Sequence, residues 1–274
     1  MSVQISDSNL NILNPSTGDS ISSIPITTDQ ELQIILDKAV LASKKYNFSK
    51  FSQRKQLLKK FRKAIVNNLD DFIEIITAET GKKEVESLME VFISLEHLHQ
   101  SSRNLNDALG KDTRRVGILK TKKAWIEYES MGVAGIISPW NYPLILTMCP
   151  MIEALLAGNT VVLKPSEHTP LTTKLLKKVW DESTKEKMLF QVVYGREAIG
   201  SGLVKSNKTD VICFTGSTAV GKIIAEFCAP IFKPVILELG GKDPMIVLED
   251  ADINRSVEAA LWEGLAMLVR RAFL

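Results

Sequence analysis

The chain has 274 residues, and 34 Lys and Arg against 32 Asp and Glu give it a formal net charge of +2. A hydrophobic content of 45% excludes intrinsic disorder, and the balanced charge argues against a dedicated nucleic-acid-binding protein. The sequence has no apolar run of about 18 residues, no export signal, and no paired spacing among Cys149, Cys213 and Cys228, so we expect a cytoplasmic protein without a membrane span, disulfide or metal site.

The N-terminal part of the chain predicts a β-hairpin followed by four helices. Two extended runs between residues 12 and 26 flank NPSTGD, whose residues favour a turn. Thr28 and Glu31 have capping-box spacing, and apolar residues then recur at helical intervals to Tyr46. Further helices are expected over 52–69, 70–81 and 84–110, with Gly110 able to adopt a left-handed C-cap. The basic face of helix 52–69 indicates a solvated surface, and binding of a phosphate polymer is the alternative.

The second part of the chain predicts strands. Residues 124–128 alternate between apolar and polar and indicate a half-exposed strand. Apolar, β-rich runs then alternate with helical segments: VAGII at 133–137, TVVLK at 160–164, FQVVY at 190–194, VICF at 211–214 and VILEL at 235–239. Strands spaced in this way predict a parallel sheet covered on both faces. Ligands of such sheets bind beyond the carboxyl ends of the strands, so the residues after each run are candidates for function.

Polar residues follow the first two of these strands. Asn141, in SPWNYP, is held between two prolines, and its amide could donate to a developing oxyanion. The alternative is a turn in which Asn141 bonds its own backbone. After the second strand, Lys164 and Glu167 are spaced to hold the two hydroxyls of one ribose, and a surface ion pair is the alternative.

The last two strands also precede candidate residues. The turn from Gly216 through Ser217 to Gly221 favours phosphate binding at a helix N-terminus, although it lacks the P-loop and GxGxxG patterns. Glu238 ends its strand, where an apolar setting could raise its pKa into the range of a general base. A buried carboxylate satisfied by backbone donors is the alternative.

The histidines and cysteines give weaker signals. His97 and His99 are two residues apart on a predicted helix, so they point to different faces and do not form a metal pair. Apolar or helical surroundings indicate that the three cysteines are inert structural thiols.

The ordered series SPWNYP, GNTVVLKPSEHTP, FTGSTAVGK and ELGGKDPMIVLEDAD resembles the NAD(P)-dependent aldehyde dehydrogenase superfamily, and the earlier NPSTGD and TAETGK resemble its N-terminal pieces. The resemblance implies an α/β fold with an atypical Rossmann parallel sheet, N-terminal helices and a fragment of the catalytic domain. It implies a cofactor-binding domain over 1–118 and 132–240, an oligomerisation arm over 119–131, and a truncated start of the catalytic domain over 241–274.

The resemblance also implies roles for the candidate residues. Asn141 would donate to the oxyanion and Glu238 would activate the hydrolytic water. The cofactor would be NAD, with NADP as the alternative, because the Glu167 carboxylate repels a 2′-phosphate. Its binding residues would be Trp140, Lys164, Glu167, Gly195, Gly216, Ser217, Gly221 and Leu239. The implied partners are an aldehyde substrate and further copies of the chain, with no nucleic acid and no membrane.

The family chemistry needs a cysteine thiolate, and the expected position of that cysteine is Ala272. The last nine residues, 266–274, read AMLVRRAFL and depart from the family pattern. One set of codons for ANAGQACISVE, after the loss of a single adenine, encodes this ending followed by a stop. We therefore expect a frameshifted member of the family that is inactive as given, with a non-catalytic NAD-binding or regulatory module, or a relic without function, as alternatives.

Overall fold

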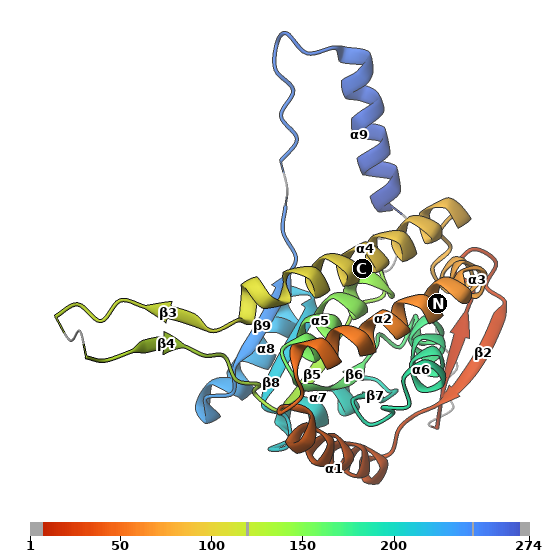
Figure 1. The fold of residues 1–274 in the computed structure, drawn as a ribbon. Coiled ribbons are helices and arrows are strands. Elements are labelled where there is room, and N and C mark those ends of the chain that lie inside the picture. The colour runs from red at the N-terminus through yellow and green to blue at the C-terminus, as the bar shows by residue number, and fades with distance from the viewer. Residues whose placement is uncertain (1–7, 119–120, 243, 269–274) are drawn as a thin grey trace.

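A computed structural model describes residues 8–118, 121–242 and 244–268 of the chain (Figure 1). Its first element is the predicted hairpin, formed by antiparallel strands β1 (Asn9–Leu13) and β2 (Ser20–Pro25). The connecting turn forms because the Asn14 side-chain oxygen accepts hydrogen bonds from the backbone N–H groups of Ser16 and Thr17.

The predicted N-terminal helices are confirmed as α1 (Asp29–Tyr46), α2 (Phe51–Asn67), α3 (Leu69–Thr80) and α4 (Glu84–Leu109). The capping box of Thr28 and Glu31 starts α1 as expected. The expectation of a left-handed Gly110 is wrong, because its φ is −65°. Glycine is needed there for space, since a Cβ would lie 2.2 Å from the Asn106 carbonyl oxygen. Gly81, with φ +72°, provides the left-handed end of α3.

A second hairpin, of β3 (Asp112–Arg114) and β4 (Ala124–Ile126), projects from the body (Figure 1). The strand predicted over 124–128 is therefore shorter than expected, and it has an antiparallel partner that the sequence did not indicate. This partner strand, β3, precedes residue 119 in the chain.

The predicted parallel sheet forms in the order β7-β6-β5-β8-β9. Its strands are β5 (Val133–Ile137), β6 (Thr160–Lys164), β7 (Phe190–Val192), β8 (Val211–Gly216) and β9 (Val235–Leu239). Between them lie α5 (Ile145–Leu156), α6 (Pro170–Thr184), α7 (Glu197–Lys205), α8 (Thr218–Cys228) and a short 3₁₀ turn (Ala229–Ile231). This is the strand order of a dinucleotide-binding sheet.

Alternating side chains of the strands build a core on each face of the sheet. On one face Ile136, Val161 and Cys213 pack with residues of α2, α4, α5 and α6. On the other face Val133 and Val162 pack with α1 and α7, and Ile212 and Phe214 of β8 pack with α8. The sheet is thus buried between helical layers, as the continuous apolar runs predicted.

The start of the central strand β5 is held by its two neighbours. The Asn159 side-chain oxygen, just before β6, accepts from the backbone N–H groups of Met131 and Gly132 at 2.7 and 2.9 Å. The Asp210 carboxylate, just before β8, accepts from the Val133 N–H at 2.7 Å. These side chains fix where the strand begins.

The chain leaves the body after β9. Residues 244–252 and helix α9 (Ile253–Leu268) extend away from the sheet (Figure 1), and Asp252 caps the N-terminus of α9. Across the ranges that the structure describes, no helix combines the length and apolar character needed to cross a bilayer.

Candidate functional site

The candidate residues meet at the carboxyl edge of the sheet. The connection after β5 leads to the neighbouring strand β6 on one side, whereas β8 lies on the other side. The loops after β5 and β8 therefore leave the sheet where its strand order reverses, the place at which open α/β sheets bind ligands. The first of these loops carries Trp140 and Asn141, and the second carries Gly216 and Ser217.

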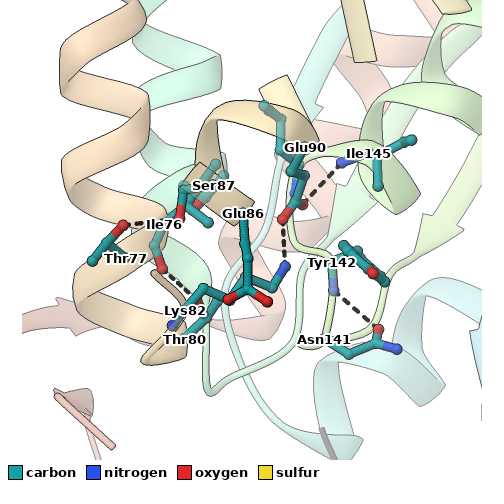
Figure 2. A network of polar contacts seen from close by, with 12 residues as sticks. Ile76, Thr77, Thr80, Lys82, Glu86, Ser87, Glu90, Asn141, Tyr142 and Ile145 are labelled. Carbon is teal, nitrogen blue, oxygen red and sulfur yellow. Dashed lines mark hydrogen bonds and ion pairs between the residues drawn. The ribbon is translucent and has the colours of Figure 1, made fainter. Parts of the chain in front are cut away.

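Asn141 bonds the backbone through one end of its amide. Its Oδ1 accepts from the Tyr142 N–H at 3.0 Å (Figure 2), as the turn alternative expected. This bond fixes the amide plane and leaves Nδ2 as the donor end, for which no acceptor lies among the described residues. The turn and the donor role are thus compatible.

Glu90, on α4, holds the loop that carries Asn141. The residue is 2% exposed, and its Oε1 accepts from the N–H groups of Leu144 and Ile145 at 2.8 and 3.3 Å. The other oxygen, Oε2, lies 2.5 Å from the Lys82 ammonium, which in turn lies 4.0 Å from the centre of the Tyr142 ring (Figure 2). The carboxylate thus fixes the start of α5, and the cation contacts the aromatic residue next to Asn141.

Glu79, on α3, holds the start of α6 in a similar way. It is 3% exposed and accepts from the N–H groups of Leu171 and Thr172 and from the Thr172 hydroxyl. Burial raises the pKa of Glu79 to about 7, against these three hydrogen bonds, which lower it. The loop between β6 and α6 is therefore fixed at its far end.

Lys164 and Glu167 lie within that loop. The Lys164 Nζ is 3.6 Å from the Glu167 carboxylate and donates to the Pro165 carbonyl at 3.1 Å. Burial lowers the pKa of Lys164, partly offset by Glu167. Because the lysine is buried and only the carboxylate is partly exposed, the pair is not the surface ion pair of the alternative interpretation.

The turn after β8 ends at the exposed N-terminus of α8. Ser217 caps the helix, its hydroxyl accepting from the Val220 N–H at 3.3 Å, and residues 217–220 are exposed. Two glycines here also have packing reasons. A Cβ on Gly216 would lie 2.5 Å from the Phe214 ring, and one on Gly221 would lie 2.5 Å from the Leu239 side chain. Gly195, after β7, is likewise buried, with Ile199 filling the place of a Cβ.

The surroundings of Glu238 differ from both interpretations of this residue, a carboxylate in an apolar setting and a buried carboxylate bonded to backbone donors. It is exposed on β9, the edge strand of the described sheet, so it is neither in an apolar setting nor buried with backbone donors. The reason is that β9 is the last strand of the described sheet: it pairs with β8 and packs against α8, and its outer edge is uncovered in the described part of the chain. Ala272 lies outside the described residues.

A sequence profile of the Aldehyde dehydrogenase family matches residues 3–267. The chain belongs to the aldehyde dehydrogenase family. Phenylacetaldehyde dehydrogenase of Pseudomonas fluorescens is 34% identical over 269 residues, which cover 93% of this chain and 52% of that protein. The chain therefore spans about half the length of the curated relatives it matches.

Solved structures of the family match the fold. An E. coli NADP-dependent enzyme has a TM-score of 0.89 at 29% identity, covering 94% of this chain and 53% of that one. PnpE, solved in complex with nicotinamide adenine dinucleotide, has a TM-score of 0.87 at 29% identity, covering 93% and 52%. These similarities confirm the α/β fold expected from the motifs.

Sequence reasoning missed three residues that shape the candidate site: Glu79, Lys82 and Glu90. A signal was present, because Glu79 follows Phe72 and Ile76 at helical spacing and thus lies on the apolar face of its helix. Glu90 likewise lies next to the buried Val91. A charged residue on a buried helix face indicates a specific partner.

Proposed function

We propose that this chain forms the NAD(P)-binding part of an enzyme that oxidises an aldehyde to a carboxylic acid. Residues 1–118 and 132–240 would form the cofactor-binding domain, 119–131 an arm for assembly with further copies, and 241–274 the start of the catalytic domain. The observation that carries the proposal is the Lys164–Glu167 pair, close to the edge at which the loops after β5 and β8 meet.

The residues present fit the cofactor. An ammonium and a carboxylate 3.6 Å apart can each bond one of two adjacent ribose hydroxyls. Burial fixes the lysine stem, which passes Gly200 of α7. The exposed N-terminus of α8 offers N–H groups to a pyrophosphate, next to Gly216 and Ser217.

Glu167 favours NAD over NADP, because its carboxylate would repel a 2′-phosphate. The names of the relatives do not decide this choice, since one solved neighbour is described as NADP-dependent and another was solved with NAD. The remaining residues proposed to line the cofactor are Trp140, Gly195, Gly221 and Leu239. When bound, NAD accepts the hydride that leaves the aldehyde carbon.

Two side chains of this chain would act on the substrate. Asn141 would donate its Nδ2 to the oxyanion that develops on the aldehyde oxygen, from a loop already fixed by Glu90. Glu238 would take a proton from the water that hydrolyses the acyl intermediate. Its exposure on an edge strand suits such a role only once further chain covers that edge.

The nucleophile of the family reaction is not one of the three cysteines of this chain. Cys213 and Cys228 are buried, and burial raises the pKa of both thiols, to about 11 for Cys213. Cys149 lies on α5 and, like the other two cysteines, precedes Glu238, within the part of the chain proposed to bind the cofactor. Because Ala272 occupies the expected position, we propose that the 274 residues alone do not oxidise aldehydes and that a lost adenine explains residues 266–274.

Calorimetric titration of the purified chain with NAD and with NADP tests the cofactor site. We expect the chain to bind NAD. The Glu167→Gln variant should bind NAD about tenfold more weakly and should show a smaller preference for NAD over NADP. Glu182→Gln, the same change on the far end of α6, is the matched control and should leave both affinities unchanged. A folded chain that gives no heat with about millimolar NAD would contradict the proposal.

Two further measurements separate an inactive enzyme from a binding module. NADH production from a panel of aldehydes would overturn the proposed lack of activity. Resequencing the DNA downstream of the Glu238 codon tests the lost adenine: a cysteine codon in the family context, in a shifted frame, is expected. Binding of NAD without turnover, and no such codon in any frame, would instead favour a non-catalytic NAD-binding module.

A further inference from the structure

A cavity of about 740 Å³ lies at the amino edge of the sheet, opposite to the edge of the candidate site. This volume is within the range of about 300–1,000 Å³ that is usual for small-molecule sites. The walls of this amino-edge cavity come from the end of α1, the turn and first part of α2 that follow it, and residues 185–189 between α6 and β7. Because residues 185–189 enter β7 at its amino end, the cavity is separate from the loops that follow the carboxyl ends of the strands.

Arg54, near the start of α2, fixes one wall of the cavity. It is 5% exposed, and its guanidinium donates to the Ser49 hydroxyl at 2.9 Å and to the Asn47 carbonyl at 3.0 Å, both in the turn after α1. A further bond, 2.9 Å to the Leu156 carbonyl, joins it to the end of α5. The same guanidinium lies 5.7 Å from the centre of the Tyr46 ring. The wall is therefore ordered before a ligand binds, which lowers the free-energy cost of binding.

Tyr46 brings a buried hydroxyl without a partner to this cavity. The residue lines the cavity and is 9% exposed, and its hydroxyl oxygen has no hydrogen-bond partner among the described residues. Because an unpaired buried donor is costly, such a group is normally met by water or by a ligand. Gln53, also in the lining, uses its Oε1 to accept from the Lys50 N–H at 2.8 Å, which leaves its Nε2 as a further donor.

The ionisable side chains of the cavity are mostly cationic. Three lysines, Lys45, Lys185 and Lys187, belong to its lining, against one acidic residue, Glu186. The three lysines are exposed, and none of them forms an ion pair within the ranges that the structure describes. Lysine and the free groups of Tyr46 and Gln53 are all donors. The polar part of the cavity therefore suits an anion that accepts hydrogen bonds.

Apolar side chains make up the rest of the walls. Leu41 of α1, Leu57 of α2 and Met188 before β7 contribute one each. Leu41 is 67% exposed and Met188 is 49% exposed, so a ligand with an apolar body would remove apolar surface from water. An inorganic anion would leave this surface uncovered, and a hydrocarbon would leave the donors unpaired. The walls thus fit a molecule that has both parts.

We propose that the amino-edge cavity binds an apolar monocarboxylate of the size of a medium-chain fatty acid. Its carboxylate accepts from the Tyr46 hydroxyl and is attracted by Lys45 and Lys187. Its chain lies against Leu41 and Met188. This inference rests neither on cofactor binding nor on aldehyde oxidation.

Calorimetric titration of the 274-residue chain with sodium decanoate tests the site. We expect one decanoate per chain, with an affinity that rises from hexanoate to decanoate by up to about fourfold for each methylene. Decylamine has the same chain and the opposite charge, and we expect it not to bind. The decanoate affinity should be the same with and without NAD, because the two sites are separate. A folded chain that gives no heat with about millimolar decanoate, or that binds decylamine equally well, overturns the proposal.

Tyr46→Phe tests the buried hydroxyl. It should weaken decanoate binding by about tenfold, because the carboxylate loses a buried donor. The stability of the variant in urea should equal or exceed that of the wild type, since the hydroxyl it lacks has no partner in the described chain. Tyr128→Phe, on an exposed residue beyond β4, is the matched control and should leave the affinity unchanged. An unchanged affinity in Tyr46→Phe would contradict the proposed site.

A pair of lysine variants tests the charge. Lys45→Gln with Lys187→Gln should weaken decanoate binding by about tenfold at low salt, and by less as salt screens the charges. The matched control is Lys44→Gln with Lys178→Gln, which removes the same charge from exposed residues of α1 and α6 outside the lining. Equal affinities in the two double variants would show that the lining lysines do not recognise the carboxylate, and would overturn the proposal.

Discussion

Two buried glutamates fix the starts of two helices, and they differ in whether a cation pairs with the carboxylate. Glu79 accepts three hydrogen bonds at the start of α6, and no ion pair with it is found in the described part of the chain. Glu90 accepts two N–H groups at the start of α5 and also pairs with Lys82. Glu90, which pairs with a cation, is thus the carboxylate that holds the loop of Asn141, the proposed oxyanion donor. Burial raises the pKa of Glu79 to about 7.

Among the changes that test this difference, Glu90→Gln should lower the free energy of unfolding the most. The change keeps an acceptor for the Leu144 N–H but leaves the Lys82 ammonium buried without its carboxylate. Breaking a buried ion pair from one side costs about 3–5 kcal/mol. Urea unfolding at neutral pH measures the loss. The double variant Glu90→Gln with Lys82→Met should recover part of it, and a single variant as stable as wild type would contradict the role of the pair.

The second expected effect is a change of stability with pH that comes from Glu79 and is smaller than the loss caused by Glu90→Gln. Its pKa is raised from 4.5 to about 7 on folding, so the folded chain holds a proton that the unfolded chain releases between these values. The contribution of this group is present below about pH 4.5 and is lost as pH rises through 7, about 3 kcal/mol in all.

Glu79→Gln removes that contribution. Unfolding free energies of wild type and variant, measured from pH 4.5 to 8, should therefore differ by an amount that falls steadily with pH. A difference that stays constant across this range would mean that Glu79 has the same pKa in the folded and unfolded chain.

Thr172→Val should have the smallest effect. It removes the hydroxyl that donates to Glu79 and should cost about 1 kcal/mol. The neighbouring Thr173 is the matched control, because its hydroxyl is buried with no hydrogen-bond partner among the described residues. Thr173→Val should be neutral or stabilising by chemical denaturation. Equal losses for both variants would indicate that packing, not the bond to Glu79, decides the outcome.

The sheet could be predicted from the sequence, whereas the buried charged residues that hold the loops of the candidate site, Glu79, Lys82 and Glu90, could not. Short apolar runs rich in β-branched residues, such as TVVLK, favour buried strands, and β6 was predicted residue for residue. The capping box of Thr28 is a local signal and was also predicted. The bonds of Glu79 to α6 join residues about ninety positions apart, which no local pattern encodes. The exposure of Glu238 depends on what covers β9, which a strand pattern does not contain.

The placement of β5 at the centre of the sheet has a consequence for the order of assembly. The contact of its start with Asn159 closes a loop of 27 residues, whereas that with Asp210 closes one of 77. The longer closure costs about 1 kcal/mol more chain entropy. As the chain emerges from a ribosome, β5 and β6 can therefore pair while β8 is still unmade. Until β8 arrives, β5 presents an open edge, and this interval is when a nascent chain most needs protection from strand exchange with its neighbours.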